Sequence, residues 1–177
     1  MSFRTLFGVL LLLFFGFLDR TFFSGLGGGR WVIDTVFVAA LIHITTFETK
    51  SSLLWIFIAA SIPEIFNDTV FGAGFVSVVV GLIGSRVALY GIFSHRSFVA
   101  RAVCGIAGVV LWTGTRTTFR WLRDIISGAN AWQSGGMLLE GTGAKGLWTG
   151  IFFLCSLFFF LQIQGRMRWF FGHKQLL

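Results

Sequence analysis

The stretch GAGFVSVVVGLIGSRVALYGIF, residues 72–93, decides the fold class. Its only charged residue is Arg86, and a helix that crosses a bilayer needs about 20 mostly apolar residues. Comparable apolar stretches lie on both sides of it. We therefore predict six transmembrane helices, near residues 3–23, 31–47, 52–66, 72–93, 98–122 and 146–163. Five helices remain an alternative, because Pro63 shortens the third stretch if it ends that helix.

The composition supports the same fold class. Of the 177 residues, 55% are hydrophobic and only 12% are charged, whereas soluble domains carry about 25% charged residues. Too little polar surface remains to face water on all sides. We expect one all-α domain over residues 1–177, a polytopic membrane helix bundle. The longest connection, residues 124–145, contains two glycine-rich clusters and is expected to be an ordinary loop.

The net charge of +7 would suggest a nucleic-acid partner in a soluble protein. In a membrane protein, Lys and Arg flank the spans and contact anionic headgroups, so the lipid bilayer is the expected partner and nucleic acid is not. Lys and Arg are slightly more numerous on the side that would hold both termini. This weak bias favours cytoplasmic termini.

Small residues recur every four positions in the fourth predicted helix and so share one face. They are Ala73, Ser77, Gly81 and Ser85. Such a face lets another helix approach closely. It either packs the protein's own bundle or contacts a partner's helix, and we take these four residues as partner-packing candidates. The fifth helix carries a parallel series, Ala100, Cys104 and Gly108, so the two stripes could also face each other.

Charged residues near the predicted helix ends form a second set of candidates. Glu64 and Asp68 lie four residues apart after the third helix, where a carboxylate is costly unless hydrated, paired or protonated. They are expected to lie in a solvated loop, to cap a helix or to pair with an arginine. Arg116, Arg120 and Arg123 share a face of the fifth helix. That face is a solvated helix end, or a basic patch for a partner's acids or lipid headgroups.

The sequence shows no arrangement typical of an enzyme. Asp34 and His43 are nine residues apart and fall on opposite sides of a helix, so His43 is read as a core residue. Cys104 and Cys155 lie in apolar runs without ligand spacing. We predict no catalytic residue, no metal site and no cofactor.

One stretch carries a family resemblance. Glu64 stands eight residues before Gly72, and an apolar helix with small residues follows. The chain also ends in an apolar helix followed by the basic residues Arg166 and Arg168. This order of features resembles the rod shape-determining protein MreD family. The departures are Glu64 and Ala60, where that family usually has Asp and Gly, the presence of Pro63, and the long 124–145 connection.

The resemblance implies a function and a fold. It implies a non-enzymatic scaffold in the cell inner membrane that takes part in cell-shape control and lateral peptidoglycan synthesis. Its partners would be a single-span MreC-like protein and cell-wall synthesis enzymes. The implied fold is similar to the substrate-binding subunits of energy-coupling-factor transporters. Polar-site candidates are Glu64, Asp68, Gly72, Arg116 and Arg120.

Two other functions compete with the scaffold. A substrate-binding membrane subunit of a vitamin or small-molecule transporter would need a polar pocket, and Glu64, Asn67, Asp68 and Arg116 could line one. A membrane enzyme acting on lipids is disfavoured, because no His/Asp/Ser cluster shares a helix face.

Overall fold

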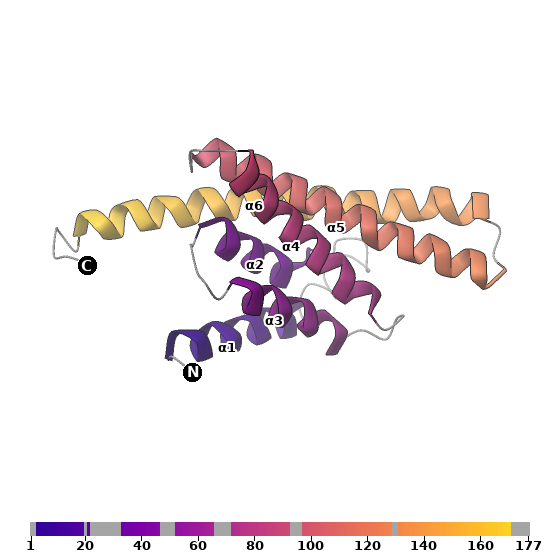
Figure 1. Cartoon of the computed structure of the whole chain (residues 1–177), viewed down its shortest axis with the longest axis horizontal. Helices are drawn as coiled ribbons and strands as arrows, with labels where there is room; N and C mark the ends of the chain where they lie inside the picture. Colours follow the sequence, from indigo (N-terminus) through magenta and orange to yellow (C-terminus); the bar gives the residue numbers. More distant parts are fainter. Residues whose placement is uncertain are drawn as a thin grey trace.

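The computed structural model contains six helices in the residues that it describes (Figure 1), and the expected all-α fold is confirmed. The described residues are 3–19, 21, 33–46, 52–65, 72–92, 97–128 and 131–170. The helices are α1 (Phe3–Leu18), α2 (Thr35–Thr46), α3 (Ser52–Ile65), α4 (Ala73–Gly91), α5 (Phe98–Ile126) and α6 (Ala131–Phe170).

Three segments among the described residues are long and apolar enough to cross a membrane: α4, α5 and Gly141–Arg166 within α6. Two shorter apolar helices are α2 and the Leu53–Ile62 part of α3. Large apolar side chains also cover the outside of the bundle, including Leu53, Val87, Val110 and Phe159, each more than 60% exposed. Such a surface suits lipid better than water. The chain is therefore a multi-pass membrane protein.

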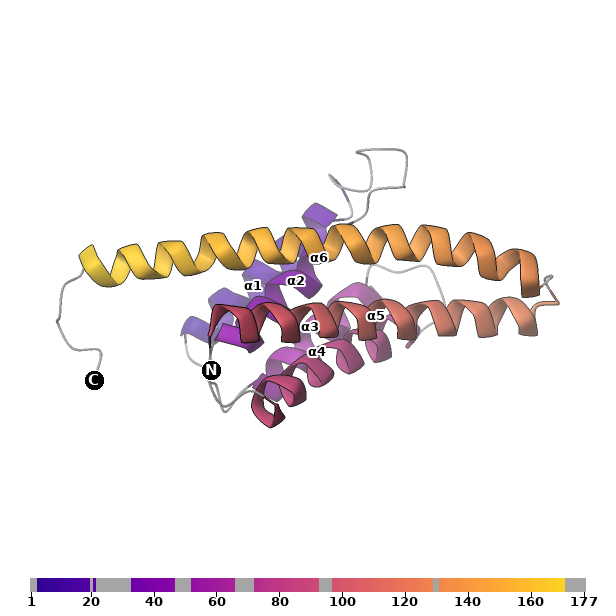
Figure 2. The ribbon, with the colours of Figure 1, turned by 90° about the horizontal axis from the view of Figure 1, so that it is seen from above.

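The first four helices form a block, and α5 and α6 form a long antiparallel hairpin that crosses it and extends past it where the two are connected (Figures 1 and 2). The 40 residues of α6 span about 60 Å at 1.5 Å per residue, twice the hydrocarbon thickness of about 30 Å. Part of the hairpin must therefore lie outside the hydrocarbon.

The expected loop at residues 124–145 is wrong for most of its length. Helix α5 continues to Ile126 and α6 begins at Ala131, so the clusters Ser134-Gly135-Gly136 and Gly141-Thr142-Gly143 lie inside α6. Glycine costs a helix up to about 1 kcal/mol, but in lipid a helix satisfies its own backbone groups, and glycines let neighbours approach. At Gly146, an added Cβ would lie 2.6 Å from the Thr113 Oγ1 atom of α5.

Other helix ends also differ from the expected ranges. Helix α1 ends at Leu18, before the charged Asp19, and α2 begins only at Thr35. Pro63 does not end the third helix, which continues to Ile65. Pro63 costs this helix one backbone hydrogen bond, because it has no N–H to donate to the carbonyl four residues earlier.

The closest helix contact joins α4 to α5. Ser77 and Ser85 are fully buried, and the Ser85 hydroxyl donates to the Cys104 carbonyl at 2.8 Å. A Cβ added at Gly108 would lie 2.9 Å from both the Gly81 carbonyl oxygen and the Ser85 Cβ atom. The two small-residue stripes therefore face each other inside the chain. A partner helix cannot reach Ser77, Gly81 or Ser85, so the partner-packing role expected of this stripe does not fit the fold.

At its other end the stripe leads toward the start of α4. Ala73 is only half-buried, and its carbonyl accepts a hydrogen bond from the Ser77 hydroxyl at 2.6 Å. On the core side of the α4–α5 contact, the Phe37 ring of α2 stacks on the Trp112 ring of α5 with centroids 4.9 Å apart. This stacking ties α2 to the α4–α5 pair.

We predict that Gly108→Ala destabilises the fold by about 1–3 kcal/mol, because the new methyl group meets backbone and Cβ atoms that cannot move away. Gly114→Ala is the matched control on the same helix, since a Cβ there meets nothing within 4 Å. It should be neutral or stabilising by up to about 1 kcal/mol. Reversible unfolding in mixed micelles measures both. Equal stability of the two variants would contradict the tight α4–α5 contact.

Candidate functional site

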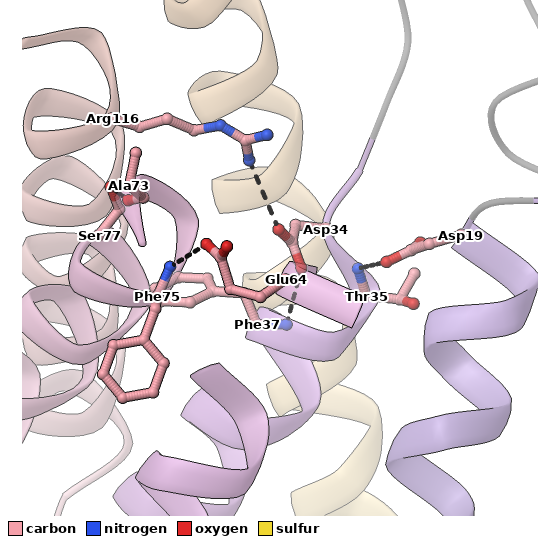
Figure 3. A network of polar contacts seen from close by, with 9 residues as sticks. All are labelled: Asp19, Asp34, Thr35, Phe37, Glu64, Ala73, Phe75, Ser77 and Arg116. Atoms are coloured by element: carbon pink, nitrogen blue, oxygen red, sulfur yellow. Dashed lines mark hydrogen bonds and ion pairs between the residues drawn. The ribbon is translucent and has the colours of Figure 1, made fainter. Parts of the chain in front are cut away.

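Figure 3 shows four charged residues, Asp19, Asp34, Glu64 and Arg116, at one end of the α1–α4 block, and Lys145 of α6 lies within electrostatic range of Asp19, Asp34 and Arg116. Because successive helices run in opposite directions, this end holds the ends of α1 and α3 and the starts of α2 and α4. The C-terminal part of α5 and the N-terminal part of α6 pass beside it. We call Asp19, Asp34, Glu64, Arg116 and Lys145 the charged cluster.

Glu64, a sequence-predicted candidate, caps the start of α4. Its Oε2 atom accepts a hydrogen bond from the Gly72 N–H at 3.0 Å, and its Oε1 atom accepts one from the Phe75 N–H at 2.7 Å. Gly72 itself has φ of 90°, a left-handed conformation that favours glycine. The first N–H groups of a helix have no partner within it, and a carboxylate there also complements the helix dipole. Of the readings open from the sequence, helix capping describes Glu64.

Two further carboxylates do the same for α2. The Asp34 Oδ1 atom accepts from the Phe37 N–H at 2.9 Å, and the Asp19 Oδ2 atom accepts from the Thr35 N–H at 2.8 Å. The Thr35 hydroxyl donates to the Phe15 carbonyl at 3.3 Å, which adds a second link between α1 and α2. Asp34 therefore precedes α2 as its N-cap, whereas the sequence reading had placed it inside the helix.

Two cations, Arg116 and Lys145, lie within electrostatic range of Asp34. The Arg116 guanidinium lies 3.9 Å from the Asp34 carboxylate, with both side chains largely buried. The Arg116 Cζ and Lys145 Nζ atoms lie over the Trp112 ring at 5.7 and 5.8 Å from its centroid. Lys145 is attracted by Asp34 and Asp19 and is repelled by Arg116. Because charges are costly in hydrocarbon unless paired, the attraction of Arg116 and Lys145 to Asp34 offsets part of the cost of burying these groups.

Arg120 lies one turn beyond Arg116 and is half-buried. It is close enough to Arg116, Arg123 and Asp124 for electrostatic interaction. Asp124 pairs with the exposed Arg123 at 3.0 Å. The three arginines predicted to share one face therefore do not share one environment. Arg116 pairs with Asp34, whereas Arg123 pairs with Asp124 at the surface.

Some buried polar atoms near the cluster have no hydrogen-bond partner. Trp112 is 1% exposed and Thr149 is fully buried, yet within the described part of the chain neither the Trp112 Nε1 atom nor the Thr149 Oγ1 atom has a hydrogen-bond partner. Thr149 lies one turn from Lys145 on the same face of α6. Unsatisfied buried donors are rare, and each calls for an explanation such as a bound group.

The structure brings some of the residues predicted from the sequence together and places others elsewhere. Three of the predicted residues come together at this end of the block: Glu64, Gly72 and Arg116. Arg120 lies one turn beyond Arg116. Two others, Asn67 and Asp68, fall outside the described residues. His43 lies elsewhere, with its ring 4.5 Å from that of Trp55. Sequence reasoning missed Asp19, Asp34 and Lys145. An Asp directly before an apolar stretch is an N-cap signal that points to Asp34.

No three His, Cys, Asp or Glu side chains among the described residues gather closely enough to hold a metal ion. The chain matches no family model, no curated protein and no solved structure. Its function must therefore be argued from the residues and their geometry.

We predict that Glu64→Ala destabilises the protein by about 1–3 kcal/mol, because two N–H groups at the start of α4 lose their acceptor. Ser61→Ala is the control from the same helix, since the Ser61 hydroxyl donates to the Phe57 carbonyl of its own helix. It should change stability by less than about 0.5 kcal/mol. Unfolding in mixed micelles measures both, and an unchanged Glu64→Ala protein would contradict the capping role.

We also predict energetic coupling between Asp34 and Arg116. Asp34→Asn keeps an oxygen for the Phe37 N–H but removes the charge, and Arg116→Gln removes the partner. The double variant should be less destabilised than the sum of the single variants, by about 0.5–3 kcal/mol. The exposed pair Arg123 and Asp124 is the control cycle, with coupling below about 1 kcal/mol. Additive effects at Asp34 and Arg116 would argue against a buried pair.

Proposed function

We propose that this protein is a non-enzymatic scaffold of the cell inner membrane, similar to the MreD family, that serves lateral peptidoglycan synthesis and cell shape. The observation that carries the proposal is the connection from Glu64 to Gly72. Its eight-residue step is the feature that resembles the family, and it has a physical purpose, because the Glu64 carboxylate bonds the Gly72 N–H.

The use made of the charged side chains supports a binding role over catalysis. Glu64, Asp34 and Asp19 each accept backbone hydrogen bonds at helix starts, and Arg116 pairs with Asp34. A general acid or nucleophile needs a reactive group free to meet a substrate. These groups instead hold the helices in position, as suits a protein that works by assembling others.

In this proposal the partners are an MreC-like single-span protein and the cell-wall synthesis enzymes, and both termini are cytoplasmic. The contact surface would lie on the exposed apolar faces of the bundle. It would not include the Ser77–Ser85 face of α4, which is buried against α5.

Affinity purification of the tagged full chain in mild detergent tests the scaffold. We expect a single-span protein with a periplasmic coiled coil to co-purify, together with a peptidoglycan polymerase or transpeptidase. Exposed changes on different faces, such as Val87→Trp on α4 and Phe159→Trp on α6, would locate the contact by lowering recovery. Reporter fusions at each terminus test the orientation. Recovery of the folded protein alone would contradict the proposal.

A second candidate, a binding subunit for a small anionic ligand, is favoured by one specific observation. The unbonded Trp112 Nε1 and Thr149 Oγ1 atoms lie in the region of the Lys145 ammonium, and together these groups offer donors to an acceptor-rich molecule. Mass spectrometry of the purified protein discriminates the two: a retained small acid, lost in Lys145→Met, would favour this candidate over the scaffold.

A further inference from the structure

An apolar groove runs along the α5–α6 hairpin. It has a volume of about 750 Å³ and is open to the outside of the bundle. Ile106, Ile151 and Leu154 line one end, and Thr117, Thr118 and Thr142 line the other. The glycines Gly143, Gly146 and Gly150 lie along α6 between these ends, and a Cβ added at Gly143 would meet nothing within 4 Å, so its missing side chain helps to keep the hollow open.

The groove is about as long as one leaflet of a bilayer. From Leu154 to Thr142 along α6, the rise of 1.5 Å per residue gives about 18 Å, and half of a hydrocarbon core is about 15 Å. In α6, residues 146–165 carry no charged side chain, and these 20 residues match the thickness of the hydrocarbon, so Thr142 lies one turn outside this stretch and Leu154 lies near its middle. The threonine end therefore lies near the membrane surface, and the apolar end lies near the bilayer midplane.

Positive charge lies at the threonine end. Arg120 follows Thr117 by three positions and Thr113 by seven, so it continues the groove-lining face of α5 past the groove. Its neighbours Arg116 and Arg123 add to the positive field, while Asp124 pairs with Arg123. The hydroxyls of Thr117 and Thr142, 3.0 Å apart, mark the polar boundary below Arg120.

We propose that this groove binds an anionic diacyl phospholipid of the surrounding bilayer. One acyl chain lies along Ile106, Ile151 and Leu154, and the phosphate lies at Arg120, near the membrane surface. Juxtamembrane cations attract anionic headgroups, and the apolar lining accepts the chain. A partner's transmembrane helix fits less well, because it crosses both leaflets whereas the groove extends over one.

The test uses the delipidated full chain in a neutral detergent, titrated with phosphatidylglycerol or phosphatidylcholine and followed by native mass spectrometry and thermal unfolding. We expect phosphatidylglycerol to bind and to raise the melting temperature more than phosphatidylcholine. Arg120→Gln should weaken phosphatidylglycerol binding about fivefold. Arg166→Gln removes the same charge at the opposite end of the α6 span and should leave binding unchanged.

Two glycine variants test whether the lipid binds in the groove or elsewhere on α6. A Cβ at Gly143 or at Gly141 meets nothing within 4 Å, so leucine is tolerated at both, but only Gly143 lines the groove. Gly143→Leu should abolish the phosphatidylglycerol-induced rise in melting temperature, and Gly141→Leu should keep it.

Three results would overturn the proposal. The first is equal affinity for the two lipids. The second is an equal response of the two glycine variants. The third is self-association of labelled copies that Gly143→Leu prevents and phosphatidylglycerol does not affect, which would assign the groove to a second copy of the chain. None of these results bears on the scaffold, whose test is co-purification.

Discussion

The contact between α4 and α5 at Gly81, Ser85 and Gly108 is the constraint on which the rest of the fold depends. Lipid offers helices no hydrophobic reason to associate, so they need close backbone approach and hydrogen bonds between them. Both are present here: a Cβ at Gly108 would lie 2.9 Å from the Gly81 carbonyl oxygen, and Ser85 bonds the Cys104 carbonyl. This contact places Trp112 against Phe37, so α2 packs on the pair and the charged cluster can form beside it.

The first N–H groups of a helix inside or beside a membrane also need hydrogen-bond acceptors, because lipid provides none. In this chain the acceptors come from carboxylates of neighbouring segments: Glu64 serves α4, while Asp19 and Asp34 serve α2. Two cations of the α5–α6 hairpin, Arg116 and Lys145, are in turn attracted to Asp34. The charged cluster thus follows from backbone chemistry and also joins the hairpin to the block.

The sequence predicted an all-α fold of six helices, because apolar length is a local signal, and its four-residue spacing left open whether the small-residue stripe of α4 packs inside the chain or against a partner. It failed at residues 124–145, where glycine clusters look like a loop but lie inside α6. Glycine at Gly146 serves the approach of Thr113, a contact between distant residues that local propensity does not reveal. Lys145 was missed for a related reason: its partners Asp34 and Trp112 are far away in sequence and meet it only through the hairpin.

The positions of the cations also bear on what kind of function the chain can have. Arg116 and Lys145 face inward, where their charges compensate acids that already accept backbone hydrogen bonds. Arg120 instead continues the groove-lining face of α5, where Asp124, the nearby acid, pairs with Arg123. A cation at the mouth of an apolar groove can attract an anionic amphiphile. The same hairpin therefore stabilises the block through one face and is available to the membrane through the other.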